Sequence, residues 1–394
     1  MSYSTFNRRS GSVRPRSSSH SFSRGPKKQN INPSRFIKAA RSVEAVAYEP
    51  TNKFEDFEVA ELLQNNLRAM KFSAPSAIQD QSIPVGLTGK DVIGVANTGT
   101  GKTIAFALPV LNKLITQPGS KVLIMAPTRE LAQQIEDEFR KLAKGSGLFG
   151  AILIGGAAMG PQLKDLRSRP SIVIGTPGRI QDHMERGSLD LSNFNVVVLD
   201  EVDRMLDMGF VNDMRLILAK LAQPRQSFFF SATLDYSVNT LIRDFSNDPV
   251  TISVKTGDTS DNVEQDVVRY GSRTQKLEKL HDLLIDSKVK ALVFDDTQRS
   301  VEKLSQELLA RGFQADAIHG GKSQGQRQRA LNRFKSNEVT VLVATDVAAR
   351  GLDVTDITHV INYSTPQSYD DYVHRIGRAG RAGRSGKAFT FIEG

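Results

Sequence analysis

The sequence contains no cysteine and no tryptophan among its 394 residues. Without cysteine, disulfide bonds, thiolate-bound metals and thiol catalysis are all excluded. The sequence also lacks any run of about 18 apolar residues, which predicts that no segment spans a membrane. The first residues carry positive charge but no apolar stretch, so they do not resemble a secretory signal. Together these absences favour a cytoplasmic protein.

Acidic residues are absent from the first 41 positions, although the whole chain holds 43 of them. The same stretch carries ten of the 52 basic residues and is rich in serine. It has too few apolar positions to form a core, which predicts a disordered basic tail over residues 1–49. Such an arm would add salt-dependent affinity for phosphate groups. The alternative is a tail that only increases solubility.

From residue 53 onward, short apolar runs alternate with amphipathic stretches, the pattern of an open parallel sheet covered by helices. A polar connector at 255–262 separates two such series. We therefore predict two α/β domains in tandem, over residues 50–254 and 263–394, joined by the linker 255–262. The expected strands are Asp91–Val95, Val122–Ala126, Ala151–Ile154, Ile172–Ile174, Val196–Leu199 and Phe228–Phe230, then Ala291–Phe294, Ala315–Ile318, Val339–Ala344, His359–Asn362 and Ala388–Ile392.

A glycine-rich turn that ends in lysine and threonine follows the first of these apolar runs, with the sequence ANTGTGKT over residues 96–103. Such a turn between a strand and a helix binds nucleotide phosphates through backbone N–H groups. Lys102 would reach the β- and γ-phosphates, and the Thr103 hydroxyl would bind Mg²⁺. The run Val196–Leu199 then ends in two acids, Asp200 and Glu201. The two motifs together predict a nucleoside triphosphatase.

Further motifs lie along the chain in a fixed order, before and after this turn. With these motifs the chain resembles the DEAD-box RNA helicases of superfamily 2 from residue 53 onward. The resemblance implies two RecA-like domains, ATP and Mg²⁺ at the first of them, and RNA as the partner. The motifs are Phe54, Pro75-Ser76-Ala77-Ile78-Gln79, the glycine-rich turn, Pro127-Thr128-Arg129-Glu130-Leu131-Ala132, Gly155-Gly156, Thr176-Pro177-Gly178-Arg179, Asp200-Glu201-Val202-Asp203, Ser231-Ala232-Thr233, His319-Gly320 with Gln324 and Arg327, Ala344-Thr345-Asp346 through Arg350-Gly351-Leu352-Asp353, and His374-Arg375-Ile376-Gly377-Arg378-Ala379-Gly380-Arg381.

Phosphoryl transfer needs positioning and charge neutralisation more than covalent work by the protein. Asp200 would hold Mg²⁺ through water, and Glu201 would position or deprotonate the attacking water. The resemblance makes Arg378 and Arg381 arginine fingers from the second domain, so hydrolysis would require the two domains to close. It also implies a set of residues that couple the two sites, namely Asp203, Ser231, Thr233 and His374.

The nucleotide is predicted to be ATP. A glutamine side chain offers a donor and an acceptor side by side, which matches the edge of adenine. Gln79 is the candidate for this contact, and Phe54 would stack on the ring face. The alternative for Phe54 is a plain core aromatic. The rest of the nucleotide site, by the turn motif and the resemblance, is Thr98, Gly99, Thr100, Gly101, Lys102, Thr103 and Asp353.

No aromatic cluster lies among the motif loops, although stacking on single-stranded bases would require one. The loops offer arginine, threonine, glycine and backbone N–H groups, which bind phosphate and ribose and predict sequence-independent binding. A preference for RNA over DNA would depend on 2′-OH contacts, which only the resemblance implies. The candidate RNA-binding residues are Pro127, Thr128, Arg129, Gly155, Gly156, Thr176, Pro177, Gly178, Arg179, His319, Gly320, Arg327, Thr345 and Asp346.

Two functions remain open at this point. The favoured one is an RNA-dependent ATPase that locally separates short duplexes and releases RNA after hydrolysis. The alternative is an ATP-gated RNA clamp, in which Val202 slows turnover because it stands where the family usually has alanine. A monomer is expected. The sequence predicts neither the physiological RNA nor a protein partner.

Overall fold

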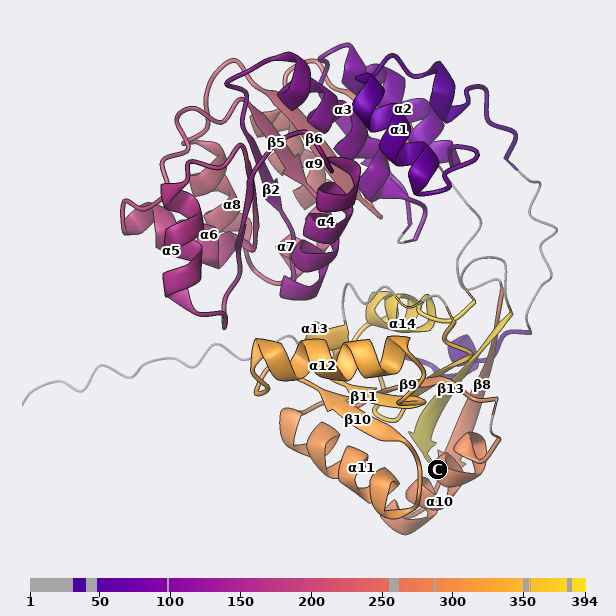
Figure 1. The fold of residues 1–394 in the computed structure, drawn as a ribbon. Coiled ribbons are helices and arrows are strands. Elements are labelled where there is room, and N and C mark those ends of the chain that lie inside the picture. Colours follow the sequence, from indigo (N-terminus) through magenta and orange to yellow (C-terminus); the bar gives the residue numbers. More distant parts are fainter. Residues whose placement is uncertain are drawn as a thin grey trace, which may run out of the picture.

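The computed structural model describes residues 31–39, 48–97, 99–254, 262–286, 288–349, 354, 356–380 and 385–394. Three residues predicted to act at the nucleotide site lie outside this described part, namely Thr98, Asp353 and Arg381. Most of the predicted tail and all of the predicted linker except Asn262 also lie outside it. Figure 1 shows two α/β units, one indigo to pink and the other orange to yellow.

The first unit is built on a seven-stranded sheet, in the order β3-β4-β2-β5-β6-β1-β7, with every pairing parallel. Its strands are β1 Val92–Val95, β2 Val122–Met125, β3 Gly150–Leu153, β4 Ile172–Gly175, β5 Val196–Leu199, β6 Gln226–Ser231 and β7 Val250–Ser253. Its helices are η2 Phe54–Asp56, α1 Glu61–Ala69, α2 Ala77–Leu87, α3 Lys102–Thr116, α4 Arg129–Leu142, α5 Met159–Arg167, α6 Pro177–Glu185, α7 Val202–Asp207, α8 Val211–Leu218 and α9 Tyr236–Phe245.

The second unit has a six-stranded parallel sheet in the order β10-β11-β9-β12-β13-β8. Its strands are β8 Val263–Tyr270, β9 Ala291–Phe294, β10 Ala315–Ile318, β11 Val341–Ala344, β12 His359–Asn362 and β13 Gly386–Glu393. Its helices are α10 Arg273–Leu284, α11 Gln298–Ala310, α12 Gln324–Lys335, α13 Asp346–Ala349 and α14 Tyr369–Ile376. Among the described helices, none combines the length and the apolar character that a membrane crossing requires.

Strands buried on both faces explain why the sequence shows continuous apolar runs rather than alternation. In β5, Val196 and Val198 pack into one apolar cluster, whereas Val197 and Leu199 pack into another on the opposite face. This arrangement confirms the predicted fold class of two parallel-sheet α/β domains. The exact domain boundaries stay predictions.

Two strands escaped the sequence analysis, and both lie at an edge of a sheet. β7 is half exposed, and β8 alternates buried and exposed residues at its start, where Glu264 and Asp266 face solvent. An edge strand that is partly exposed to solvent contains polar residues. Neither segment therefore shows the apolar run that is typical of a central strand.

The prediction of a disordered tail over residues 1–49 is wrong for residues 31–39. Pro33–Phe36 forms a short 3₁₀ helix, η1, with Asn32 at its N-cap, and Phe36 is fully buried in a core cluster of the second unit. The composition of residues 1–49 does not predict this contact, because a single aromatic residue, Phe36, makes most of it. Of the other predicted tail residues, 1–30 and 40–47 lie outside the described part, whereas Tyr48 and Glu49 lie within it.

Candidate active site and RNA interface

The glycine-rich turn connects β1 to α3 and holds two glycines in the left-handed region. Gly99 has a φ of 81° and Gly101 a φ of 88°. A side chain at Gly101 would also collide with Gln79, since its Cβ would lie 2.3 Å from the amide nitrogen of that residue. Lys102 begins α3, and its Nζ donates a hydrogen bond to the Ala96 carbonyl at 3.1 Å. The turn therefore leads directly into a helix N-terminus, where free backbone N–H groups attract anions.

Gln79 uses both ends of its amide inside the protein. Its Oε1 accepts from the Ser76 N–H at 2.9 Å, and its Nε2 donates to the Gly101 carbonyl at 3.0 Å. Phe54 is only 3% exposed and packs edge-on against Phe57, which is the core arrangement considered as its alternative. Adenine recognition by Gln79 and stacking by Phe54 stay predictions. Each of them requires the side chain to exchange a contact within the protein for one with the base.

The end of β5 places two carboxyl groups in a buried position. Asp200 is 3% exposed and accepts a hydrogen bond from the Glu201 N–H at 3.0 Å. Burial raises the pKa of Asp200 to about 6, although the neighbouring Lys102 ammonium opposes the increase. Glu201 has a φ of 54° and a ψ of 55°, a left-handed conformation that is costly for any residue with a side chain. Strain of this kind collects at functional sites, and here it turns the chain from β5 into α7.

The chemistry of these groups fits a magnesium ion held together with a nucleotide. Within the described residues, no three histidine or acidic side chains gather into a protein-only metal cage. Mg²⁺ usually keeps several waters and takes one or two carboxylates together with substrate phosphates. One buried carboxyl group beside a phosphate-binding turn therefore suits it. A cation near Asp200 would also offset the burial that now disfavours its ionised form.

Asp203 connects the acid motif to the end of β6. Its Oδ2 accepts from the backbone N–H groups of Ala232 and Thr233, both at 3.1 Å, while its own N–H donates to Ser231 Oγ at 3.3 Å. The structure thus brings together three of the four residues predicted to couple the two sites. The fourth, His374, lies on α14 of the second unit and lines a recess that includes Arg204 from the first unit.

Arg375, which the sequence analysis did not select, organises the same recess from the second unit. It forms a two-pronged ion pair with Asp346, with both N···O distances at 2.6 Å. The same guanidinium donates to the Ser364 carbonyl at 2.8 Å and is almost fully buried. Asp346 was predicted to bind RNA, but the structure shows its carboxylate bound to Arg375. Arg378, the described one of the two predicted arginine fingers, lines this recess as well.

Predicted RNA-binding residues of both units line one cavity of about 420 Å³. The first unit contributes Pro127, Thr128, Arg129, Gly155, Thr176, Gly178 and Arg179, and the second contributes Gly320 and Arg327. Four further lining residues were missed, namely Glu130, Met208, Phe210 and Val347. Gly156, Pro177, His319, Thr345 and Asp346 were predicted as well but do not line it. The ring nitrogen Nε2 of His319 instead contacts Glu302 at 2.9 Å.

Three arginines concentrate positive charge at this cavity. Burial lowers the pKa of Arg129, and the charges of Arg327 and Arg179 lower it further. The Arg129 guanidinium lies directly against Gly156, where an added Cβ would be 2.1 Å from its Nη1. A side chain at this position would therefore displace the Arg129 guanidinium from its present place. Clustered cations of this kind favour a bound phosphate backbone.

A buried ion pair joins the two units beside this cavity. Arg327 Nη2 lies 2.8 Å from Glu130 Oε1, and the two side chains are 7% and 1% exposed. Next to it, Gln324 Nε2 donates to Gln133 Oε1 at 3.0 Å. Burial raises the pKa of Glu130, although Arg327 opposes the increase. These contacts connect α12 to α4, and Figure 1 shows α12 on the side of the second unit that faces the first.

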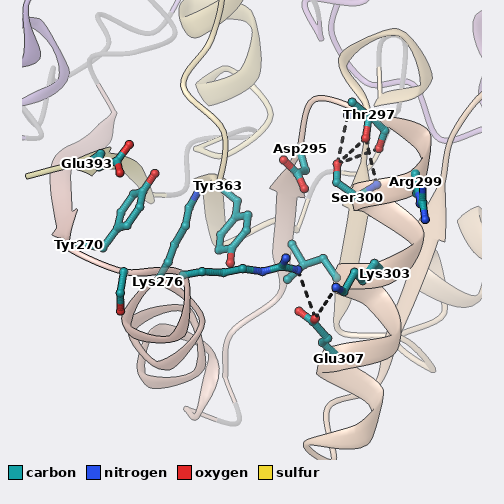
Figure 2. Close-up of a pocket in the computed structure, with 13 residues that line it drawn as sticks. Tyr270, Lys276, Asp295, Thr297, Arg299, Ser300, Lys303, Glu307, Tyr363 and Glu393 are labelled. Atoms are coloured by element: carbon teal, nitrogen blue, oxygen red, sulfur yellow. Dashed lines mark hydrogen bonds and ion pairs between the residues drawn. The ribbon is translucent and has the colours of Figure 1, made fainter.

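Another cavity, of about 620 Å³, lies in the second unit at the carboxyl ends of its strands, and no predicted site residue lines it. β8 ends at Tyr270 and β13 at Glu393, while Asp295 follows β9 and Tyr363 follows β12. Figure 2 shows Lys276 extending between the rings of Tyr270 and Tyr363. The Lys276 Nζ lies 4.6 Å and 4.1 Å from the centroids of these two rings.

A phosphate-binding turn, a buried acid pair and a basic cavity shared by two RecA-like units define a two-domain helicase. Family comparisons agree, since residues 76–241 match the DEAD/DEAH box helicase model and residues 275–383 match the helicase conserved C-terminal domain model. The chain is 42% identical over 345 residues to the DEAD-box ATP-dependent RNA helicase CshA of Bacillus subtilis, covering 87% of this chain and 70% of that protein. The chain belongs to the DEAD-box ATP-dependent RNA helicases.

Solved structures give the same assignment. S. cerevisiae Dbp5 bound to RNA and ADP BeF3 is 27% identical with a TM-score of 0.77, and the match covers 86% of this chain and 89% of that one. Mss116p bound to ssRNA and AMP-PNP is 28% identical with a TM-score of 0.78, covering 88% and 76%. A DEAD box protein from Methanococcus jannaschii is 38% identical with a TM-score of 0.50, covering 86% and 93%.

Proposed function

We propose that this protein binds single-stranded RNA through its backbone and locally unwinds short duplexes, with ATP hydrolysis coupled to closure of the two domains. The observation that carries the proposal is a basic cavity that both domains line. A strand bound there would contact Arg129 and Arg179 from one side and Arg327 from the other. RNA binding and domain closure would then favour each other, because only the closed arrangement offers all three arginines.

The lining of the cavity supports binding without base recognition. Arginine, threonine and glycine residues there bind phosphate and ribose oxygens and carry no sequence information. Phe210 adds one aromatic ring to the lining, which supplies a single stacking surface and not the continuous platform that base-stacking proteins use. We therefore propose sequence-independent binding.

For hydrolysis, we assign the first domain the groups that hold the nucleotide. Lys102 would bind the β- and γ-phosphates, and Thr103 and Asp200 would hold Mg²⁺, which neutralises phosphate charge when bound. Glu201 would orient the attacking water and accept its proton, from a backbone position fixed by the turn into α7. Arg378 and Arg381 would complete the site from the second domain.

The arrangement of the two domains supports the closure step. The chain has a higher TM-score with RNA-bound Dbp5 than with the Methanococcus jannaschii protein, at the same coverage of 86%, although its sequence is closer to the latter. We infer from this difference that the two domains are placed relative to each other more as in RNA-bound Dbp5. The Asp203 contacts with the end of β6, beside the recess that His374 lines, offer a path from hydrolysis to domain placement.

Multiple-turnover ATP hydrolysis with and without RNA tests this proposal, together with displacement of a short labelled strand. Glu201→Gln should keep ATP and RNA binding but reduce turnover by roughly 10²–10⁴, the usual contribution of a general base. The matched control is Glu58→Gln, an exposed acid outside the site, which should behave as the parent. Residual activity of Glu201→Gln within a few-fold of the parent would exclude its role.

No observation favours the alternative of a slow RNA clamp. Val202 is fully buried and belongs to an apolar cluster that includes Met205 and Phe229, so its extra carbons are accommodated in the core. We therefore expect normal turnover. The monomeric state, the use of Mg²⁺ and the cytoplasmic location stay predictions.

A further inference from the structure

The N-terminal segment makes a specific contact with the second domain. Phe36 is fully buried, and its ring centroid lies 4.7 Å from that of Tyr372 on α14. The Arg35 guanidinium lies 3.7 Å from the ring centroid of Tyr369, one turn earlier on the same helix. An aromatic anchor with a cation–π contact beside it holds the segment against α14 by side chains.

Backbone hydrogen bonds add a second hold on the same domain. Lys38 and Gln265 form an antiparallel bridge, with N–H···O distances of 3.0 Å and 2.8 Å. The Gln265 side chain in turn accepts from the buried Tyr372 hydroxyl at 2.8 Å. One connected set of contacts therefore joins residues 31–39, β8 and α14. This matters for function because α14 carries His374 and Arg375 and leads directly to Arg378.

A few residues later the chain is attached to the first domain. Asp80, which is almost fully buried on α2, accepts from the Tyr48 hydroxyl at 2.6 Å and from the Thr51 N–H at 2.8 Å. It also accepts from the N–H and the side-chain amide of Asn52, at 3.0 Å and 2.7 Å. Asp80 directly follows Gln79, the residue assigned to adenine. The second attachment is therefore made on α2, the helix that also carries Gln79.

Between the two attachments the sequence has only eight residues, 40–47. Even fully extended, the nine steps from residue 39 to residue 48 span about 30 Å. The two domains are thus tied twice, once by this segment and once by the chain between β7 and β8.

We propose that residues 31–52, hereafter the strap, are an intramolecular tether that limits how far the two domains separate and so favours their closure on RNA. The proposal extends the proposed function, since it presumes that closure accompanies RNA binding. The occupant of the surface formed by β8 and α14 is this segment of the chain itself. A second tether raises the effective concentration of one domain near the other without adding any contact to RNA.

Lengthening the strap between its two attachments tests the proposal, because every contact is kept and only the tether is relaxed. A 20-residue Gly/Ser insertion after Ser42 would take the connection from eight to 28 residues, which lowers the effective concentration up to about six-fold by the −3/2 power of length. The matched control carries the same insertion after Gln29, upstream of both attachments. Affinity is measured by anisotropy of a labelled single-stranded RNA with a non-hydrolysable ATP analogue.

We expect weaker RNA binding, by up to that factor, for the insertion after Ser42, with unchanged melting temperature and unchanged turnover at saturating RNA. The control insertion should match the parent. Equal RNA affinity of the parent and both insertion variants would overturn the tether. A lower melting temperature with unchanged RNA affinity would also overturn the tether, because the segment would then contribute to packing only.

Phe36→Ala and Phe36→Leu give an independent measurement at the other end. Alanine removes the anchor and should weaken RNA affinity as the insertion does, whereas leucine keeps an apolar anchor and should restore most of it. The parent in the same assay separates the two proposals. A parent without RNA-stimulated hydrolysis contradicts the proposed function, whereas an active parent whose strap variants bind RNA equally well contradicts the strap alone.

Discussion

The two sheets share one plan but differ at a single turn. Reading the second sheet with β8 as its first strand gives the same order as six strands of the first sheet, and all pairings are parallel. In the first sheet, six residues separate the end of β1 from α3, and they form the phosphate-binding turn. In the second sheet, two residues, Gly271 and Ser272, separate β8 from α10. A turn that short has no length to surround a phosphate group.

The equivalent position in the second domain is the cavity around Lys276. Ligands of parallel sheets bind at the carboxyl ends of strands, and in the second domain this cavity lies there. Lys102 reaches back to a carbonyl of its own turn, whereas Lys276 lies between two tyrosine rings. Likewise Asp200 follows β5, but Tyr363 follows β12 in its place. The difference teaches that a turn and one acid distinguish the domain proposed to bind the nucleotide from the domain proposed to supply arginines.

Replacing each of the two lysines by alanine is the strongest test of this comparison. Lys102→Ala should reduce ATP turnover by roughly 10²–10³, because it removes a positive charge at the transferring phosphate. Lys276→Ala should leave turnover and ATP affinity unchanged, since its charge is used against Tyr270 and Tyr363. Steady-state hydrolysis at saturating RNA measures both. Equal losses in the two variants would mean that the second domain also binds the nucleotide.

Asp200→Asn should stabilise the free protein while abolishing activity. Burial raises the pKa of Asp200 from 3.8 to about 6, so between these values the folded state binds more protons than the unfolded one. Ionisation therefore costs stability as pH rises, and the full cost, up to about 3 kcal/mol, applies above pH 6.

Melting temperatures at two pH values measure this effect. The gain for Asp200→Asn should be larger at about pH 8 than at about pH 4.5. The matched control is Tyr363→Phe, whose effect should not change over this interval, because burial raises the pKa of Tyr363 to about 12. A gain for Asp200→Asn that is independent of pH would contradict the assignment.

Gln79→Ala should weaken ATP binding and reduce the preference for ATP over GTP. The loss of a two-pronged base contact is worth about 1–3 kcal/mol of discrimination. The control is Gln226→Ala, since Gln226 is equally buried and bonds to backbone carbonyls of Gly86 and Lys90 away from the turn. Competition binding with both nucleotides measures the ratio. If the ratio of ATP affinity to GTP affinity is unchanged in Gln79→Ala, Gln79 serves only to contact Ser76 and Gly101 within the protein.

The smallest effect is expected for the charged residues that precede residue 31. Deleting residues 1–30 removes seven basic residues but keeps the strap and every motif. If four of these charges contact RNA, the slope of log affinity against log salt should become shallower by about three units. Saturated turnover should not change. RNA affinity is measured against salt concentration for the parent and the shortened chain. Identical slopes would show that the tail only increases solubility.

Local motifs were predictable from the sequence, and contacts between distant segments were not. The turn at 96–103 and the acid pair at Asp200 are contiguous, and each follows an apolar run whose end fixes its place in the sheet. The pairs Arg375–Asp346 and Glu130–Arg327 join separate motifs, so no spacing along the chain predicts them. Phe36 is one aromatic residue in a polar stretch, and only its partner Tyr372 explains its burial.

The bridge between Lys38 and Gln265 has a consequence for the solubility of shortened chains. β8 is an edge strand of eight residues, and an open edge offers N–H and C=O groups on which another chain can add as a strand. In this chain, the backbone of Lys38 forms hydrogen bonds with both the N–H and the C=O group of Gln265. A chain that begins at Lys53 keeps every helicase motif but leaves this edge uncovered. Such a chain gains a site for strand-to-strand self-association.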